Sequence, residues 1–288
     1  MRFVFTACLL FFSLSIFAQD ELLKELENSD STSNEPVIAT FSGTRLVNGH
    51  SVETRHKNIL EFIITHRFGK LNSGAYQAFG LDNSAVRIGL EYGITDRLNV
   101  GIGRSSSDKT LDYLAKYKVL QQSKTMPVTV TVLGTASYRG FKDVVSNELN
   151  TTEKMSYVTQ LLIARKLSSR VSLQLAPSLL YRTTVDQDIA VNNLISLGMG
   201  GRIKITKSMA VVLEYYLRLN EKSNNPYNDA IGINIEFETG GHVFQLVFTN
   251  TLGMVERHFM AETEGDFFDG DIHFGFNITR AFQLGRKK

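Results

Sequence analysis

The sequence predicts an all-β fold, an antiparallel up-and-down transmembrane β-barrel of about 12 strands. Segments of roughly ten residues alternate between apolar side chains and polar or glycine residues, the two-residue period of a strand. Tight turns alternate with long loops along the chain, as in bacterial outer-membrane barrels. After the N-terminal leader, no stretch reaches the roughly 18 uncharged apolar residues that a spanning helix needs. A membrane-spanning chain of this kind must therefore cross as strands.

The alternation is clearest between Leu194 and Asn220. Odd positions from Ile195 to Ile205 are apolar except for Gly201, whereas even positions carry serine, glycine or a basic residue. A polar turn follows at residues 206–208, after which every odd position up to Leu219 is again apolar. Such long strands with one continuous apolar side are typical of a membrane barrel.

Residues 1–18 are predicted to be a signal peptide. Arg2 precedes an apolar run from Phe3 to Phe17, and Ala18 before Gln19 offers a cleavage site. The run is too short for a membrane helix. Cys8, the single cysteine, falls within this leader, so the mature chain has no thiol for a disulfide or a cysteine-based metal site.

Residues 19–56 are predicted to form a periplasmic N-terminal segment that is partly disordered, because residues 20–35 are mainly acidic and polar. Residues 37–55 contain a turn signal at Asn48-Gly49 among scattered apolar residues. Three placements remain open for them: a periplasmic hairpin, a segment tucked into the barrel, or a docking arm.

The barrel is predicted over residues 57–282, followed by a polar C-terminal tail at 283–288. Pro177 lies within the seventh strand, where we expect a β-bulge because proline lacks the ladder donor. The 12 expected strands are 59–68, 85–94, 97–105, 111–121, 128–139, 155–167, 170–182, 194–205, 208–219, 230–238, 243–251 and 271–282.

Loop lengths predict the orientation in the outer membrane. Tight turns such as Thr95-Asp96 and Ser168-Ser169 belong on the periplasmic side, and the long loops face outward. With these strand phases, lipid-facing aromatic residues fall into two girdles. The outer girdle contains Tyr138, Tyr157, Tyr181 and Tyr215, and the periplasmic girdle contains Tyr92, Phe237, Phe244 and Phe282.

Several stretches resemble an outer-membrane β-barrel family of Gram-negative bacteria that is known only as a domain of unknown function. They are His66-Arg67-Phe68-Gly69, Phe79-Gly80-Leu81-Asp82, the segment from Glu91 to Ser106, and residues 271–277 (DIHFGFN). The resemblance covers Phe41 to Phe282. It implies the fold and the outer-membrane location, and it brings no catalytic residues with it.

The sequence does not favour an enzyme. A serine lipase of the outer-membrane type needs a His-x-Ser pair on one strand, which is absent, and no two histidines have metal-ligand spacing. Carboxylates between Glu262 and Asp271 are interpreted as a solvated loop rather than a calcium site. We therefore predict no catalytic residue, no metal and no cofactor. The net charge of +2 implies no nucleic-acid partner.

Two functions remain open: a narrow channel or porin for small solutes, and a closed structural barrel that serves as a docking platform for a periplasmic or surface partner. Outer-membrane lipid and lipopolysaccharide are the expected surroundings in both cases. Inward glycines leave room in the lumen, which favours a pore unless residues 37–55 fill that room. These glycines are Gly89, Gly101, Gly103, Gly198, Gly200, Gly232 and Gly275.

The strand phases also place charged side chains in the lumen. The predicted basic ring in the outer half comprises Arg67, Arg87, Arg139, Arg182 and Arg218, and the predicted acidic residues are Glu61, Glu91, Glu214 and Glu236. The ring could enrich anions at a narrow mouth. Alternatively, these arginines pair with carboxylates and brace the barrel, since buried ions need partners.

Overall fold

A computed structural model describes residues 36–141 and 149–285. The predicted signal peptide (1–18), residues 19–35 and the end of the predicted tail (286–288) lie outside the described residues. None of the helices in the described part of the chain is long and apolar enough to cross a membrane.

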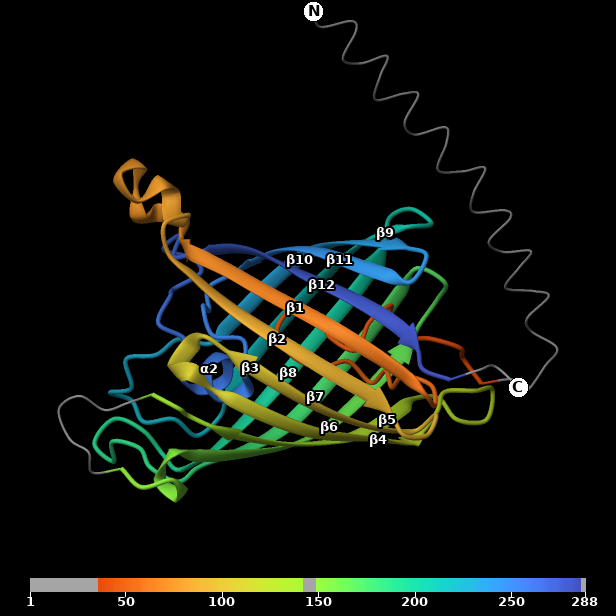
Figure 1. The fold of residues 1–288 in the computed structure, drawn as a ribbon, viewed down its shortest axis with the longest axis horizontal. Helices are drawn as coiled ribbons and strands as arrows, with labels where there is room; N and C mark the ends of the chain where they lie inside the picture. Colours follow the sequence, from red (N-terminus) through yellow and green to blue (C-terminus); the bar gives the residue numbers. More distant parts are fainter. Residues whose placement is uncertain (1–35, 142–148, 286–288) are drawn as a thin grey trace, which may run out of the picture.

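Twelve strands form one closed antiparallel sheet in which each strand pairs with its neighbours in the chain and β1 pairs with β12 (Figure 1). This arrangement confirms the predicted fold class. The strands are β1 (Ile59–Lys70), β2 (Ser84–Gly93), β3 (Leu98–Ser105), β4 (Leu111–Leu120), β5 (Thr129–Tyr138), β6 (Met155–Lys166), β7 (Val171–Arg182), β8 (Asn193–Lys204), β9 (Met209–Arg218), β10 (Ala230–Thr239), β11 (His242–Thr249) and β12 (His273–Gln283).

The predicted strand ends differ from the observed ends by at most two residues, and the largest differences are at Lys70, Thr249 and His273. The prediction of a β-bulge at Pro177 is wrong. Gln160 pairs with Ser178 and Ile163 with Leu175, so the register between β6 and β7 is the same on both sides of the proline. The missing donor leaves a local gap in one ladder, while Pro177 still pairs with Leu197 of β8.

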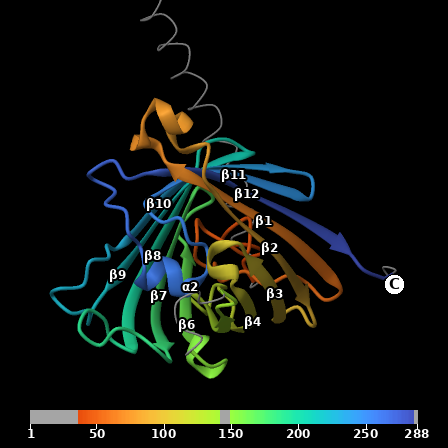
Figure 2. The same ribbon diagram turned by 60° about the vertical axis from the view of Figure 1, so that its left-hand side comes forward.

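The two ends of the barrel differ. The end of β12 and the tight turns lie at one end, which we call the short-turn end, and the longer loops gather at the other, the long-loop end (Figure 1). The loops at the long-loop end carry the 3-10 helices η1 (Leu71–Ser73), η2 (Ala75–Gly80), η3 (Ser107–Lys109) and η4 (Thr152–Lys154), and the short helix α2 (Glu256–Ala261). Figure 2, which brings the long-loop end forward, shows α2 within the mouth of the barrel.

The wall alternates between an outer apolar surface and a buried inner surface, as a lipid-facing barrel requires. On β9, Leu213 is 51% exposed and the adjacent Val212 is 1% exposed. Some aromatic residues on the outer surface lie opposite each other on neighbouring strands. Tyr157 of β6 is paired with Tyr181 of β7, and Phe237 of β10 with Phe244 of β11.

Candidate functional site

Residues 36–57, which we call the plug, run into the barrel, and their central part, residues 40–54, lies inside it (Figures 1 and 2, red). Every residue from 40 to 54 is buried except Ser42, which is half-buried. Of the three placements that the sequence left open, the structure shows the segment within the lumen. The core of the molecule therefore lies between the plug and the inner wall.

The plug folds back on itself at the turn that the sequence signalled. The amide of Leu46 donates to the carbonyl of Gly49 at 2.9 Å, and the amide of Ser51 donates to the carbonyl of Thr44 at 3.0 Å. The turn leaves the amides of Val47, Asn48 and Gly49 free to point at the wall. Successive amides that converge in this way form an anion-binding nest.

Glu214 of β9 fills this nest. Its carboxylate accepts hydrogen bonds from the amides of Val47 (3.2 Å), Asn48 (2.9 Å) and Gly49 (3.0 Å). Only glycine fits at position 49, because an added Cβ would lie 2.1 Å from the hydroxyl oxygen of Tyr216. A charge-assisted hydrogen bond is about twice as strong as a neutral one. Glu214 is thus the main anchor of the turn.

The other three glutamates predicted to face the lumen also contact the plug. Glu61 accepts a hydrogen bond from the hydroxyl of Thr44 at 2.7 Å and forms an ion pair with Arg55. Two further contacts complete the set: Glu91 lies 3.6 Å from Arg45, and Glu236 accepts a hydrogen bond from the hydroxyl of Ser42. The four acids therefore surround the plug from β1, β2, β9 and β10.

Lys116 of β4 holds the plug from a different part of the wall. It is fully buried, and its Nζ lies 3.2 Å from the backbone carbonyl oxygens of Thr44, Ser51 and Glu53. Sequence reasoning did not identify Lys116 as a functional residue, nor the wall amides that donate to plug carbonyls. The sequence does indicate that these side chains face the lumen, because residues on a strand alternate between the two sides of the wall. These amides are Asn234 and Gln245, which donate to Leu46, Gln174, which donates to His50, and Asn277, which donates to Val47.

Apolar side chains and inward glycines complete the fit. A Cβ built on Gly232 would lie 2.6 Å from a methyl carbon of Val47, and one on Gly200 would lie 2.4 Å from a methyl carbon of Leu46. The space left by these two glycines is therefore filled by the plug. The plug shares a buried apolar cluster with wall residues, formed by Phe41, Leu46, Val47, Val52, Leu114, Leu133, Leu162, Ala164, Ala176, Val212 and Val247.

Helix α2 fills the barrel from the long-loop end. All six of its residues are buried, and Phe259 packs against Tyr216 with ring centroids 5.0 Å apart. At its first residue, the carboxylate of Glu256 lies 3.1 Å from Nε2 of His50 and 3.6 Å from the guanidinium of Arg45. The plug and α2 thus meet inside the barrel. No pattern in the sequence indicates this helix, which is shorter than two turns.

Each arginine of the predicted basic ring has a defined partner. Arg67 donates to the carbonyl of Val47 and to the side-chain oxygens of Asn48 and Asn277, at distances between 2.9 and 3.3 Å. Arg139 lies in the loop after β5 rather than within the strand. The other four arginines form ion pairs: Arg87 with Asp112 (2.5 Å), Arg139 with Asp108 (2.7 Å), Arg182 with Glu221 (3.5 Å) and Arg218 with Asp229 (3.1 Å).

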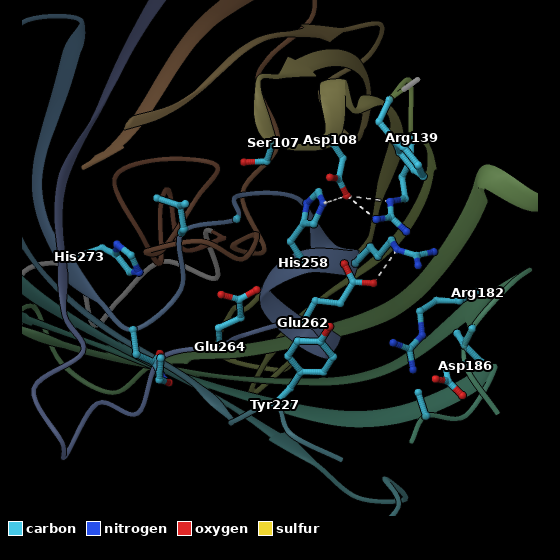
Figure 3. Close-up of a pocket in the computed structure, with 18 of the residues that line it drawn as sticks. Ser107, Asp108, Arg139, Arg182, Asp186, Tyr227, His258, Glu262, Glu264 and His273 are labelled. Carbon is cyan, nitrogen blue, oxygen red and sulfur yellow. Dashed lines mark hydrogen bonds and ion pairs between the residues drawn. The ribbon is translucent and has the colours of Figure 1, made fainter. Parts of the chain in front are cut away.

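A cavity of about 910 Å³ opens at the long-loop end, and we call it the vestibule. Figure 3 shows Asp108 between His258 and Arg139, with Glu262 nearby. Asp108 is 3.3 Å from Nε2 of His258 and 2.7 Å from Arg139. The hydrogen bond from His258, followed by the charge of Arg139, holds the pKa of Asp108 well below its usual range. The charged residues that line the vestibule are Lys70, Asp108, Arg139, Glu153, Lys154, Arg182, Asp186, Arg257, His258, Glu262, Glu264 and His273.

Within residues 36–141 and 149–285, one group of side chains has the composition of a metal site. Ligand atoms of Asp108, His258 and Glu262 lie within 4.8 Å of one another. Both carboxylates already accept hydrogen bonds from arginine, Asp108 from Arg139 and Glu262 from Arg257. A divalent cation would have to displace two guanidinium groups, so this geometry does not favour metal binding.

The chain is similar to several solved membrane barrels at low sequence identity. It matches a KdgM porin at 7% identity and a TM-score of 0.48, over 77% of this chain and 99% of that one. It matches an outer membrane channel from Pseudomonas putida F1 at 12% identity and a TM-score of 0.48, over 80% and 97% of the two chains. It matches outer membrane phospholipase A from Escherichia coli at 8% identity and a TM-score of 0.44, over 81% of this chain and 93% of that one.

No curated protein sequence matches this chain. A family model described as "Membrane bound beta barrel domain (DUF5777)" matches residues 41–282. The match confirms the resemblance drawn from the sequence over the same part of the chain. It includes most of the plug and all 12 strands except Gln283, the last residue of β12. The chain therefore belongs to this family of membrane-bound β-barrel domains of unknown function.

Proposed function

We propose that this protein is an outer-membrane channel for small solutes whose lumen is closed at rest by its own N-terminal plug. The signal peptide exports the chain, the short-turn end faces the periplasm, and the long-loop end faces outward. Outer-membrane lipid and lipopolysaccharide surround the wall. The observation that carries the proposal is the docking of a separate, continuous segment onto a polar lumen wall through hydrogen bonds and ion pairs.

The chemistry of the plug interface supports reversible closure. Glu214, Glu61 and Lys116 contact the plug through groups that water can also solvate. Such hydrogen bonds contribute only about 0.5–3 kcal/mol each in net free energy, because protein–water bonds replace them when the plug leaves. A wall built only to be filled permanently would gain more from apolar packing, since buried ion pairs are often no more stable than apolar replacements. The polar wall suits a lumen that is at times filled with water.

The cavities at the two ends of the barrel support a passage that the plug interrupts. The vestibule lies at the long-loop end, and a second cavity of about 350 Å³ lies at the short-turn end next to Ser42, Arg55 and Glu61. The two cavities share no lining residue. Plug residues between Gly43 and Thr54 are buried in the lumen, and their release would enlarge the space between the cavities.

Conductance in a planar lipid bilayer tests the proposal. We expect brief openings in the parent protein and a higher open fraction in Glu214→Gln, which removes the charge from the nest of amides. Hydrogen bonds to charged groups contribute about 1.5–3 kcal/mol, so the open fraction should rise at least about tenfold. Glu238→Gln is the matched control, because Glu238 lies on β10 with its carboxylate near Arg202.

The alternative is a closed structural barrel that serves as a docking platform for a periplasmic or surface protein. One observation favours it: the lumen is filled from both ends, by the plug and by α2, and the two contact each other through Glu256. A folded parent protein and a folded Glu214→Gln variant that both fail to conduct would contradict the channel and support this platform.

A further inference from the structure

Helix α2 touches both the plug and the vestibule through consecutive residues. Glu256 lies 3.1 Å from His50 of the plug, whereas Arg257 and His258 line the vestibule. The helix is a single short element, and Phe259 fixes it against Tyr216 of the wall. A displacement of Arg257 or His258 would therefore also displace Glu256. This arrangement provides a physical connection between the vestibule and the plug.

Two buried arginines of the vestibule each have an N–H group that lacks a hydrogen-bond acceptor. Arg182 of β7 is 1% exposed and Arg257 of α2 is 4% exposed. Among the described residues, Nε of Arg182 and Nη1 of Arg257 have no acceptor, and Nδ1 of His258 has no partner. A guanidinium carries five N–H donors, and a buried donor without an acceptor is unfavourable. These residues line the same cavity, and a ligand with oxygen acceptors would satisfy their free N–H groups.

The acids of the vestibule satisfy these guanidiniums only in part. Glu262 accepts a hydrogen bond from Nε of Arg257 at 3.0 Å, and the carbonyl of Val191 accepts one from Nη2 of Arg182 at 2.7 Å. Glu221 lies 3.5 Å from the same Nη2. Burial lowers the pKa of Arg257, and the nearby charge of Arg139 acts in the same direction, against the opposing effect of Glu262. An added anion would relieve both effects.

A carboxylate or a phosphate group would supply the hydrogen-bond acceptors that these N–H donors lack. Both groups present several oxygen acceptors and bind arginine in a bidentate geometry. Lys154 and Arg139, at the same cavity, would attract such a group. Asp186 and Glu264 also line the vestibule and would accept hydrogen bonds from hydroxyl groups of the same solute. The vestibule has the volume of a typical small-molecule site, about 300–1,000 Å³.

We propose that the vestibule binds a small hydroxylated solute that carries a carboxylate or phosphate group, and that α2 transmits this binding to the plug. The second part rests on the proposed channel function, while the first stands without it. When the solute engages Arg257, α2 shifts and Glu256 moves away from His50 and Arg45. This movement removes the carboxylate partner of His50 and one of the two carboxylates near Arg45, the other being Glu91, and so weakens the closed state.

Calorimetric titration of the purified full barrel tests the binding. The probes are gluconate, inorganic phosphate and sorbitol, a neutral polyol of similar size to gluconate. We expect gluconate or phosphate to bind, sorbitol not to bind, and the affinity to fall at least tenfold in Arg182→Gln and in Arg257→Gln. Arg218→Gln is the control, because Arg218 lies at the same end and does not line the cavity. Lys154→Gln, which changes a half-buried lysine of the cavity, serves if either arginine variant fails to fold.

Absence of binding by the folded parent, equal binding of sorbitol, or an equal loss of affinity in Arg218→Gln would overturn the site. Transmission is tested separately by maleimide labelling of Val47→Cys, since Val47 is 1% exposed when the plug is seated. Gluconate should speed labelling severalfold, and Glu256→Gln should still bind gluconate but lose this acceleration. Binding without any acceleration would overturn transmission while leaving the site intact. Labelling that never occurs, with or without gluconate, would instead contradict the mobile plug of the proposed channel.

Discussion

Gly49 is the residue on which the seating of the plug depends most closely. Its amide donates to Glu214, and its α-carbon faces the ring of Tyr216 without room for a side chain. The sequence predicted that Glu214 faces the lumen but could not predict its partner. The amide of Asn48 lies 166 positions away along the chain, and no local pattern indicates such a contact. The sequence therefore predicted the turn at Asn48-Gly49 and the inward position of Glu214, but not the contact between them.

Replacing this glycine should displace the turn. In Gly49→Ala, the new Cβ would lie 2.1 Å from the hydroxyl oxygen of Tyr216, so the turn must shift and the nest around Glu214 must distort. We expect a destabilisation of about 1–3 kcal/mol, as for overpacking, and faster proteolysis of the plug. Gly43→Ala is the matched control in the same segment, because its Cβ would meet only backbone atoms of Arg45 at 3.8 Å or more. Equal protease sensitivity of the two variants would contradict the observed seating.

Asp271 gives a pH-dependent test in the last long loop. Asn72 and Lys70 donate to its carboxylate at 2.7 and 2.9 Å, and these hydrogen bonds lower the pKa of Asp271 to about 2. A lowered folded-state pKa stabilises the protein above the unfolded value of about 4, and this contribution is lost as the pH falls through the folded value. Asp271→Asn should therefore lower the free energy of unfolding at pH 6 by no more than about 1 kcal/mol, which is seen as a slightly lower Tm. At about pH 1, below the folded-state pKa, its Tm should equal that of the parent, and a difference that persists there would refute the assignment.

At the scale of elements, the strands were predictable because their apolar outer surface repeats every second residue regardless of what lies inside. The position of the plug was not predictable, since a polar inner wall can face either water or a polar segment. Inward glycines such as Gly200 and Gly232 carried a signal, because their empty space receives Leu46 and Val47. Helix α2 has six residues, all buried, and therefore no amphipathic period.

Neighbouring positions on β9 should respond differently to a charge. Leu213→Arg places a cation on the exposed outer surface and should lower the stability in lipid by about 2–4 kcal/mol near the midplane. Val212→Arg points into the lumen, where Val212 packs in the apolar cluster that includes the plug. It should leave insertion of the barrel largely intact and displace the plug. Refolding into vesicles and limited proteolysis measure the two effects, and a loss of insertion in Val212→Arg equal to that in Leu213→Arg would contradict the strand phase.

At the scale of the whole molecule, the barrel is a closed wall with two separate fillings. The wall follows from the sequence alone, because 12 alternating strands with alternating loop lengths have one simple closed arrangement. The positions of the plug and of α2 depend on contacts across the lumen, such as those from Lys116 to the plug and from Glu256 to His50. These contacts join residues that are far apart in the chain. The function proposed here depends on whether the plug can leave.

A redox-controlled crosslink between plug and wall tests this point most directly. A Cβ built on Gly232 lies 3.2 Å from Cβ of Val47, close to the roughly 3.5–4.5 Å found in disulfides, so Val47→Cys with Gly232→Cys should form a bond after a small shift. The chain has no other cysteine than Cys8, which lies in the predicted signal peptide. The single variants Val47→Cys and Gly232→Cys serve as controls.

The measurement is single-channel conductance of this double variant in a planar bilayer, before and after addition of a reductant. We expect a silent barrel when the disulfide is closed, openings after reduction, and no effect of the reductant on either single variant. Openings of the same conductance and frequency in the crosslinked and reduced states would contradict the plug as the gate.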